Sequence, residues 1–378
     1  MYGRSVAFAT PARLREIQQR LLAWFQEHAR DLPFRHERSP YRVLVAEMML
    51  QQTQAATVGP YLERFCARFP TPEALAAAPL QEVLALWQGL GYYRRARYLH
   101  AAAVRIVQEH GGVVPCGTAD LRRLPGVGPY VAAAVASFAF GRDEPAVDAN
   151  ARRVLARVGG VSLLDDALAR AFVPSGQGAA WNEAVMDLGA LVCLPRSPRC
   201  GGCPLLGLCS AQASGRTAEL PARRPRPVRP SLPVLLLAIC DVDGRFGLER
   251  RPETGLLAGM WGFPTLEGSG GSDPVAVAAG WGIRLRSVEA LQPFRHVFTH
   301  RVWEVRPFAA VGEGPLHWVA PKDVEQLPMA GPSVRVLRQL AAGASGQGCE
   351  GGARDGSAGW RIAPTGTATP LGRSGPVR

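Results

Sequence analysis

Lysine is almost absent from this sequence of 378 residues, whose basic side chains are arginines except for Lys322. Enzymes that form a Schiff base with a carbonyl group need a lysine amine. We therefore expect no such chemistry from the 321 residues that precede Lys322. The formal net charge is nevertheless +12, which suggests a polyanionic partner.

Long apolar runs are missing as well. The longest, such as 131–140, fall well short of the ~20 residues that a membrane span needs and suit buried helices instead. The N-terminus carries Arg4 but no sustained apolar segment. We therefore expect no secretory signal and no membrane association.

The chain is long enough for two domains, and its periodicity changes past the middle. Apolar residues at helical spacing predict an all-α domain over 1–220. A basic, Pro-rich linker, PARRPRPVRPSLP, follows at 221–233. Short strand-like runs with Gly-rich turns predict a smaller α+β domain at 234–342. The Gly/Ser/Thr/Pro-rich tail at 343–378 is expected to be disordered.

The same periodicities predict individual elements. If the stretch 294–300 is a strand, His296 and His300 share one of its faces and Thr299 points the other way. Helices are expected at 14–29, 41–58, 61–69, 71–77, 80–88, 94–110, 165–172, 181–191, 274–279 and 334–341, and strands at 234–240, 246–249, 294–300 and 302–308.

Glu47 stands inside an apolar run, 43–49, of a helix that we expect to be buried nearly all round. Burial disfavours the charged carboxylate, so the pKa of an unpaired glutamate is expected to rise here. Such a group stays protonated near neutral pH and can serve as a general acid. The alternative is a glutamate that is paired with an arginine across a helix contact.

A short motif, LPGVG at 124–128, precedes an Ala-rich apolar run. Gly126 and Gly128 permit a tight hairpin, and Pro129 suits the first position of the following helix. Free backbone N–H groups at this point can bind a phosphate. An ordinary turn between two helices is the alternative.

Asp148 precedes a helical pattern that contains Val154, Leu155 and Val158, which predicts an N-cap. The carboxylate then accepts backbone N–H groups at the positive end of the helix dipole, so we expect it to be held ionised. Glu47 and Asp148 are thus expected to be shifted in opposite directions. That pattern is typical of an acid and an electrostatic stabiliser.

Four of the eight cysteines lie within 17 residues, in the pattern Cys-x6-Cys-x2-Cys-x5-Cys. Four thiolates suit either a [4Fe–4S] cluster or an all-thiolate zinc site. Zinc sites favour paired CxxC elements, and the single CxxC therefore favours iron–sulfur. The clustered cysteines are Cys193, Cys200, Cys203 and Cys209.

The stretch GLGYYRR at 89–95 combines flexible backbone with aromatic and cationic side chains. That mixture suits stacking on bases and contact with phosphates. Packing of the aromatic rings in a core is the alternative.

Taken together, these motifs resemble the MutY family of adenine DNA glycosylases, within the helix-hairpin-helix superfamily that includes endonuclease III. The resemblance runs from Leu14 to Leu340 and is carried by AEMMLQQTQ, GLGYYRRAR, LPGVGPY, AVDAN, the four cysteines, GLLAGMWGFP and FRHVFTH. It implies an all-α helix-hairpin-helix glycosylase domain with a [4Fe–4S] cluster. A smaller α+β, Nudix-like domain for recognition of 8-oxoguanine follows.

The resemblance implies a reaction in base excision repair. Adenine that is paired with 8-oxoguanine or guanine in double-stranded DNA is flipped out, and Glu47 protonates the base to make it a leaving group. Asp148 stabilises the oxocarbenium-like sugar, with Tyr130 and Asn150 beside it, and water completes the hydrolysis. Because positive charge builds on the sugar as the bond breaks, this mechanism agrees with the expected states of both acids.

The family's contact residues can be carried over to the matching positions. The resemblance implies DNA contacts from Leu50, Gln52, Thr53, Tyr92, Gly126, Val127 and Gly128, an adenine pocket with Arg35 and Glu183, and contacts with 8-oxoguanine from Phe298, Thr299 and His300.

Several departures limit what the resemblance implies. Endonuclease III carries its catalytic lysine where Tyr130 stands, so we expect base removal without strand cleavage. The stretch PVAVAAGWGIRLRS has no carboxylate where a Nudix box would place metal-binding glutamates, so pyrophosphate hydrolysis is not expected. The family usually has serine at Thr299, glycine at Ala149 and tryptophan at Phe34.

Other interpretations stay open at this point. A glycosylase of the same scaffold could act on thymine in G:T mispairs, although such relatives generally lack the second domain. A catalytically silent DNA-binding module with a redox-sensing cluster and a zinc-bound regulator are two further classes. For the favoured interpretation we expect a monomer in the bacterial cytoplasm, associated with the nucleoid.

Overall fold

The computed structural model describes residues 10–222, 228–268 and 271–345. The tail predicted at 343–378 therefore lies outside the described residues, except for 343–345, which end a helix. Within the described ranges, no helix is both long and apolar enough to cross a membrane.

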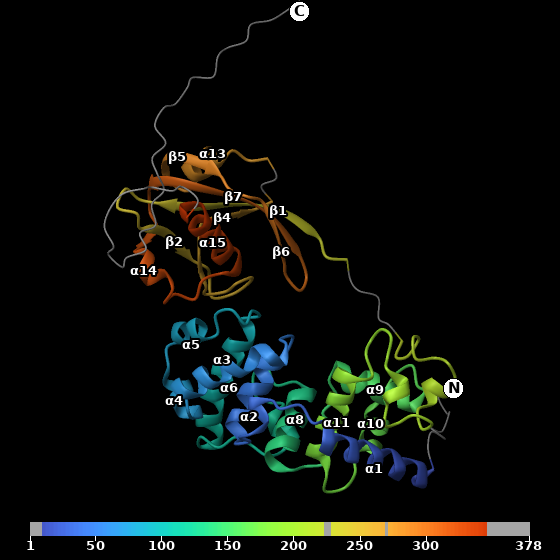
Figure 1. Ribbon diagram of the computed structural model, residues 1–378. Coiled ribbons are helices and arrows are strands. Elements are labelled where there is room, and N and C mark those ends of the chain that lie inside the picture. The colour runs from blue at the N-terminus through green and yellow to red at the C-terminus, as the bar shows by residue number, and fades with distance from the viewer. Residues whose placement is uncertain (1–9, 223–227, 269–270, 346–378) are drawn as a thin grey trace, which may run out of the picture. The chain divides into compact units, whose positions relative to one another are not determined.

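The chain divides into two compact units, with the boundary between Arg226 and Pro227. The first unit is helical (Figure 1). Its elements are α1 (Pro11–His28), η1 (Pro33–Arg35), α2 (Pro40–Leu50), α3 (Ala55–Arg68), α4 (Pro72–Ala77), α5 (Leu80–Leu86), α6 (Arg94–His110), α7 (Thr118–Leu121), α8 (Pro129–Phe140), α9 (Ala149–Gly159), α10 (Asp166–Phe172), α11 (Gly178–Leu191), η2 (Cys200–Gly202) and α12 (Ser210–Ala213).

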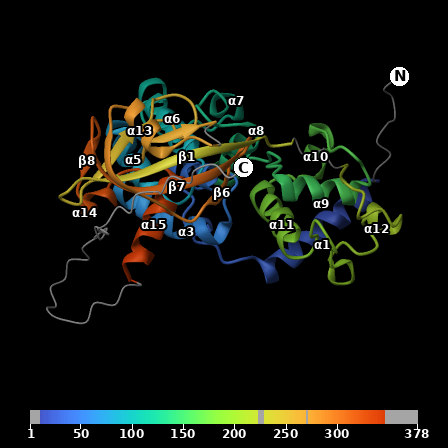
Figure 2. The ribbon, with the colours of Figure 1, turned by 90° about the horizontal axis from the view of Figure 1, so that it is seen from above.

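Two hydrophobic cores stabilise the helical unit. One is formed by α2 to α8 and includes the fully buried side chains of Leu44, Phe65 and Trp87. The other is formed by α1 and α9 to α11 and includes Phe172 and Trp181, whose rings stack at 6.4 Å. Figures 1 and 2 show the helices of the second core side by side. The unit therefore has two halves, each with an apolar interior.

Helix α2 is buried around its whole circumference from Tyr41 to Met49, as its apolar run predicted. The helix predicted at 41–58 is wrong beyond Leu50, because the chain turns at 51–54 before α3 begins.

The turn forms because the last carbonyl groups of α2 are bound by another helix. Arg95, on α6, donates hydrogen bonds to the carbonyl oxygens of Met48 at 3.2 Å and Met49 at 2.6 Å. Gln52 adopts a φ of +60°, a left-handed conformation that ends a helix. These bonds satisfy carbonyl groups that a helix end leaves without a partner.

The hairpin expected at 124–128 joins α7 to α8. Gly126 has a φ of +76°, and the N–H of Val127 donates to the carbonyl oxygen of Leu124 at 3.1 Å. Pro129 occupies the first turn of α8, which agrees with the sequence prediction. The hairpin thereby fixes where α8 starts.

The second unit is a mixed sheet with helices on both faces (Figure 1). The elements are β1 (Ser231–Cys240), β2 (Phe246–Arg250), β3 (Trp261–Gly262), β4 (Thr265–Glu267), α13 (Pro274–Gly280), β5 (Arg284–Ala290), β6 (Phe294–Val297), β7 (Val302–Glu313), β8 (His317–Val319), α14 (Pro321–Val324) and α15 (Gly331–Ser345).

Strand β1 lies at the centre of the sheet, whose main order is β3-β2-β1-β7-β5. It pairs with β7 in parallel (Figure 2), whereas β2, β4, β5, β6 and β8 pair antiparallel with their neighbours. Leu236 and Ala238 belong to the core that contains Val336 of α15, while Leu235 and Leu237 belong to the core that contains Ala278 of α13. An unbroken apolar strand fits this position because both of its faces are buried.

The strand predicted at 294–300 is too long. Strand β6 ends at Val297, and the N–H of Phe298 donates to the carbonyl oxygen of Arg301 at 2.9 Å, which closes a turn. The chain must reverse here because β6 and β7 are antiparallel neighbours. The expectation that His296 and His300 share a strand face is therefore wrong.

We expect Gly126→Ala to destabilise the full chain and Gly128→Ala to leave its stability nearly unchanged. A Cβ at Gly126 meets the Cβ of Tyr98 at 2.5 Å and the Cε of Met48 at 2.9 Å, whereas a Cβ at Gly128 meets no atom within 4 Å. Strain and overpacking predict a loss of about 2–4 kcal/mol for the first variant. Urea unfolding followed by circular dichroism measures both variants, and equal midpoints contradict this account.

Candidate active site and cysteine loop

A cavity of about 560 Å³ opens between the two halves of the helical unit. It is bordered by α2, the turn at 51–54, the start of α8, the start of α9 and the middle of α11. Nine of the residues expected to act in the site or beside it line this cavity: Arg35, Glu47, Leu50, Gln52, Thr53, Tyr130, Asp148, Asn150 and Glu183.

Glu47 projects from the buried helix α2 and is 5% exposed. Burial raises its pKa to about 7, and the negative charges of Asp148 and Glu183 act in the same direction. The Tyr130 hydroxyl donates a hydrogen bond of 2.7 Å to Glu47 Oε2 and lowers that pKa. The expected upward shift is confirmed, and the hydrogen-bond partner is a phenol rather than an arginine.

Asp148 is the N-cap of α9, and its Oδ1 accepts the N–H of Ala151 at 2.6 Å. The cap was expected and is present, but the expected direction of the pKa shift is wrong. Burial raises the pKa of Asp148, and the backbone N–H groups of Ala151 and Asn150 only reduce this effect. The loss of hydration in the cavity wall therefore raises the pKa of Asp148 by more than the hydrogen bonds at the helix start lower it.

An ion-pair network closes the cavity on the side of α11. Arg35 donates from both terminal nitrogens to Asp187 at 2.9 Å, and Arg30 Nε donates to Asp187 at 2.7 Å. Glu183, one turn earlier, receives two bonds of 3.0 Å from Arg38 and lies 3.3 Å from Arg35 Nε. The network fixes Arg35 and Glu183 against each other in the cavity wall.

Asp187 was not predicted from the sequence. In the structure its side chain has no exposed surface. Burial alone raises the pKa of Asp187, but hydrogen bonds from Arg35 and Arg30 outweigh it and lower the pKa. Glu183 and Asp187 are four residues apart in the stretch 181–191, whose other residues are apolar or small except for Asn182. That spacing places both acids on one helix face and was the available signal.

Two expected DNA contacts lie away from the cavity. Tyr92 is 45% exposed and precedes α6, and the hairpin Gly126–Val127–Gly128 precedes α8. Phe298, Thr299 and His300 lie in the turn of the second unit.

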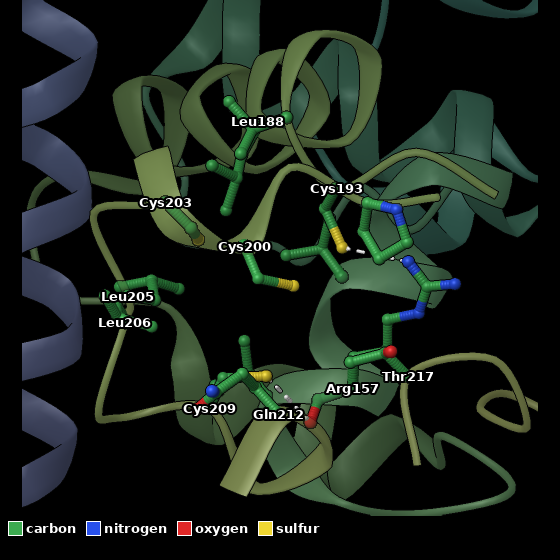
Figure 3. Close-up of a pocket in the computed structure, with 14 residues that line it drawn as sticks. Arg157, Leu188, Cys193, Cys200, Cys203, Leu205, Leu206, Cys209, Gln212 and Thr217 are labelled. Atoms are coloured by element: carbon green, nitrogen blue, oxygen red, sulfur yellow. Dashed lines mark hydrogen bonds between the residues drawn. The ribbon is translucent and has the colours of Figure 1, made fainter. Parts of the chain in front are cut away.

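The four clustered cysteines surround a second, mostly apolar cavity (Figure 3). Arg157 Nη1 donates to Cys193 Sγ at 3.3 Å and to the carbonyl oxygen of Leu194 at 2.7 Å. Among the described residues, no three His, Cys, Asp or Glu side chains form a group that could hold a single metal ion. Four cysteine thiols around one cavity fit the ligand set of an iron–sulfur cluster.

The cysteine loop is tied to the first cavity through α9. Arg153 Nε donates to the carbonyl oxygen of Cys193 at 2.8 Å, and Arg153 Nη2 donates to Asn150 Oδ1 at 3.0 Å. One arginine thus contacts both a cavity residue and a cysteine of the loop.

Comparison with known proteins follows the same division of the chain. A model of the HhH-GPD superfamily of base excision DNA repair proteins matches residues 45–171. The iron–sulfur binding domain of endonuclease III matches 193–209, and a NUDIX domain matches 235–339.

An adenine DNA glycosylase from Rattus norvegicus is 35% identical over an alignment of 385 positions, which covers 83% of this chain and 74% of the rat protein. The chain belongs to the adenine DNA glycosylase family. A Mycobacterium tuberculosis member is 44% identical over an alignment of 214 positions, which covers 54% of this chain and 70% of that protein. A Buchnera aphidicola member is 29% identical over an alignment of 298 positions, which covers 76% of this chain and 84% of that protein.

A solved structure of a thermostable thymine-DNA glycosylase superposes on the helical unit of this family member. The TM-score is 0.52 at 32% identity, and the match covers 54% of this chain and 98% of that chain. The match of residues 193–209 to the iron–sulfur binding domain of endonuclease III identifies the group that the cysteine loop holds. Cys193, Cys200, Cys203 and Cys209 are the ligands available for the iron–sulfur cluster.

We expect Asp187→Asn to destabilise this adenine DNA glycosylase family member by about 3 kcal/mol, because it removes a buried negative charge that the partly buried Arg30 and Arg35 share. Asp31→Asn is the matched control, since Asp31 pairs with His36 on the surface, where its side chain is 87% exposed. Thermal unfolding by calorimetry compares the two variants. A loss that is no larger for Asp187→Asn contradicts the structural role of the network.

Proposed function

We propose that this protein removes adenine from mispairs with 8-oxoguanine or guanine in double-stranded DNA, by hydrolysis of the N-glycosidic bond and without cutting the strand. The observation that carries the proposal is that Glu47 and Asp148, from separate helices, line one cavity of about 560 Å³. A cavity of this size can admit a base that has been flipped out of the duplex.

Glu47 is the proposed general acid. With a pKa of about 7, close to half of the molecules carry the proton at neutral pH, where a glutamate in water would be ionised. Transfer of that proton to adenine turns the base into a neutral leaving group. Arg35 and Glu183 are proposed to hold the base, because the ion-pair network fixes both side chains in the cavity wall.

Asp148 is the proposed stabiliser of the sugar. As the bond to adenine breaks, positive charge develops on the deoxyribose ring, and a carboxylate beside it lowers the energy of the transition state. Asn150 lies two residues further on, in the first turn of α9, and its Oδ1 accepts a hydrogen bond from Arg153. Tyr130, on α8, donates its hydrogen bond to Glu47. Water then adds to the sugar.

Strand cleavage by a Schiff-base lyase is not part of the proposal. Tyr130 stands where endonuclease III has its lysine, and Lys322, the single lysine, lies in the second unit. A hydrogen-bonded phenol is no substitute for the amine that such an enzyme needs.

The remaining contacts are proposed to hold the mispair. Gln52 is exposed and lines the cavity together with Leu50 and Thr53, which are partly buried. Tyr92 and the hairpin 126–128 are proposed to touch the duplex. In the second unit, the 298–300 turn packs through Phe298 against Trp303, at a ring distance of 5.0 Å. That anchor supports a role of the turn in recognition of 8-oxoguanine. We propose that the protein acts as a monomer in the cytoplasm, on nucleoid DNA.

We expect wild-type protein to release adenine from A:8-oxoguanine and A:G duplexes, but not thymine from G:T duplexes. The strand should break only after alkali treatment. Single-turnover reactions on end-labelled duplexes, split into samples with and without alkali, measure both properties, and Glu47→Gln is the inactive control. Release of thymine, or nicks without alkali at the rate of base loss, contradicts the proposal.

We expect the single-turnover rate to fall by about tenfold per pH unit above about pH 7, because deprotonated Glu47 cannot donate. Tyr130→Phe removes a hydrogen bond that favours the charged carboxylate, so the pKa of Glu47 rises further. The midpoint of the decline should therefore move up by roughly one pH unit. Tyr61→Phe also removes a phenol hydroxyl, but Tyr61 does not line the cavity. It should leave the pH midpoint of the decline unchanged. A downward shift for Tyr130→Phe rules out this assignment of the acid.

A further inference from the structure

Arg95 is a buried cation, only 6% exposed, in the interior of the helical unit. Its hydrogen-bond partners among the described residues are carbonyl oxygens and one hydroxyl, with no carboxylate. Burying an arginine without a counter-charge is costly, so the bonds that it makes must serve a local purpose.

The first set of bonds reaches the end of α2 and the turn that follows. Nη1 donates to the carbonyl oxygens of Met48, Met49 and Gln51, and Nη2 donates to Thr53 Oγ1 at 3.0 Å. These bonds hold the 51–53 segment in a turn rather than in another helical turn.

The second set of bonds reaches a different loop. Nη2 also donates to the carbonyl oxygens of Leu90 at 3.3 Å and Gly91 at 3.0 Å. The guanidinium carbon lies 5.4 Å from the centre of the Trp87 ring and 5.5 Å from that of Tyr92. None of these contacts is needed to cap α2. The Arg95 side chain therefore also joins the 51–53 segment to the 90–92 loop.

Each loop presents one exposed residue in a conformation that non-glycine residues rarely adopt. Gln52 has a φ of +60°, and Tyr92 has a φ of +49°. Such conformations persist only where surrounding contacts impose them. The contacts of Arg95 are in a position to do so for both residues, because they fall on their immediate neighbours and on the Tyr92 ring.

We propose that Arg95 is a positioning residue that joins the 51–53 and 90–92 loops into one rigid wedge, whose exposed residues Gln52 and Tyr92 open the duplex beside the adenine. The proposal rests on the proposed function, in which a base leaves the stack before it reacts. Such a wedge must be rigid, because separating stacked bases costs free energy. A planar guanidinium with five N–H donors can bind the backbones of both loops at once.

The wedge is separate from the proton chemistry. Arg95 contacts the carbonyl groups that follow Glu47 in α2, whereas the Glu47 carboxyl is bonded to Tyr130. Loss of Arg95 should therefore reduce opening of the duplex without moving the pH midpoint of the reaction.

The test compares Arg95→Met and Arg95→Lys with Arg105→Met. Arg105 is also on α6, but it pairs with Glu109 on the surface. Lysine keeps the charge but has a compact head that cannot reach both loops. Each full-length variant is assayed on a fully paired A:8-oxoguanine duplex and on one whose base pairs flanking the lesion are replaced by mismatches.

On the paired duplex, we expect the rate to fall about 10- to 100-fold for both Arg95 variants, as expected for unstacking costs of a few kcal/mol. On the pre-opened duplex, the rate should return to within about threefold of wild type. Arg105→Met should match wild type on both. An equal loss on both duplexes indicates a general structural defect and overturns the proposal, as does no loss on the paired one.

A second measurement does not depend on catalysis. In a Glu47→Gln background, 2-aminopurine next to the adenine should brighten on binding when Arg95 is present and stay dim in Arg95→Met and Arg95→Lys. Equal brightening overturns the inference about Arg95. Brightening in the parent protein without adenine release by wild type instead contradicts the proposed function, so the two failures are distinguishable.

Discussion

The structure depends on a carboxyl group that is kept out of water by its own helix. Helix α2 is buried on every side from Tyr41 to Met49, and Glu47 shares that burial, with the Tyr130 hydroxyl as its hydrogen-bond partner. An ionised glutamate is expensive to hold in such a place. The apolar sequence of α2 therefore buries the helix and, with it, raises the pKa of Glu47. The second half of the helical unit supplies the opposite wall of the cavity.

Sequence patterns predicted the helical and mixed domains, the buried helix around Glu47, the cap at Asp148 and the gathering of the cysteines. They failed where the outcome depends on distant parts of the chain. The pKa direction of Asp148 was wrong because its desolvation comes from walls that its neighbours do not form. The end of α2 was wrong because Arg95 lies 45 residues beyond Leu50. Asp187 was missed because its arginine partners precede it by more than 150 residues.

Arginine does structural work in this protein that composition alone does not reveal. Arg95, Arg153 and Arg157 are all buried, and each donates mainly to backbone carbonyl oxygens at the ends of helices or in loops. A high arginine content suggests a surface made for a polyanion. In this protein some of the arginines are buried instead, and their guanidinium groups hold irregular backbone segments in one conformation. The net charge therefore overstates how much of the surface is available to DNA.

The buried guanidinium at Arg95 has a consequence for how the protein responds to acid and alkali. Burial lowers the pKa of Arg95 to about 10, still about three units above that of Glu47. When the pH passes through neutrality, the proposed general acid Glu47 exchanges its proton while the Arg95 guanidinium keeps its charge. The two groups thus titrate in separate pH ranges, so Glu47 can lose its proton while the hydrogen bonds that Arg95 donates to the end of α2 stay in place.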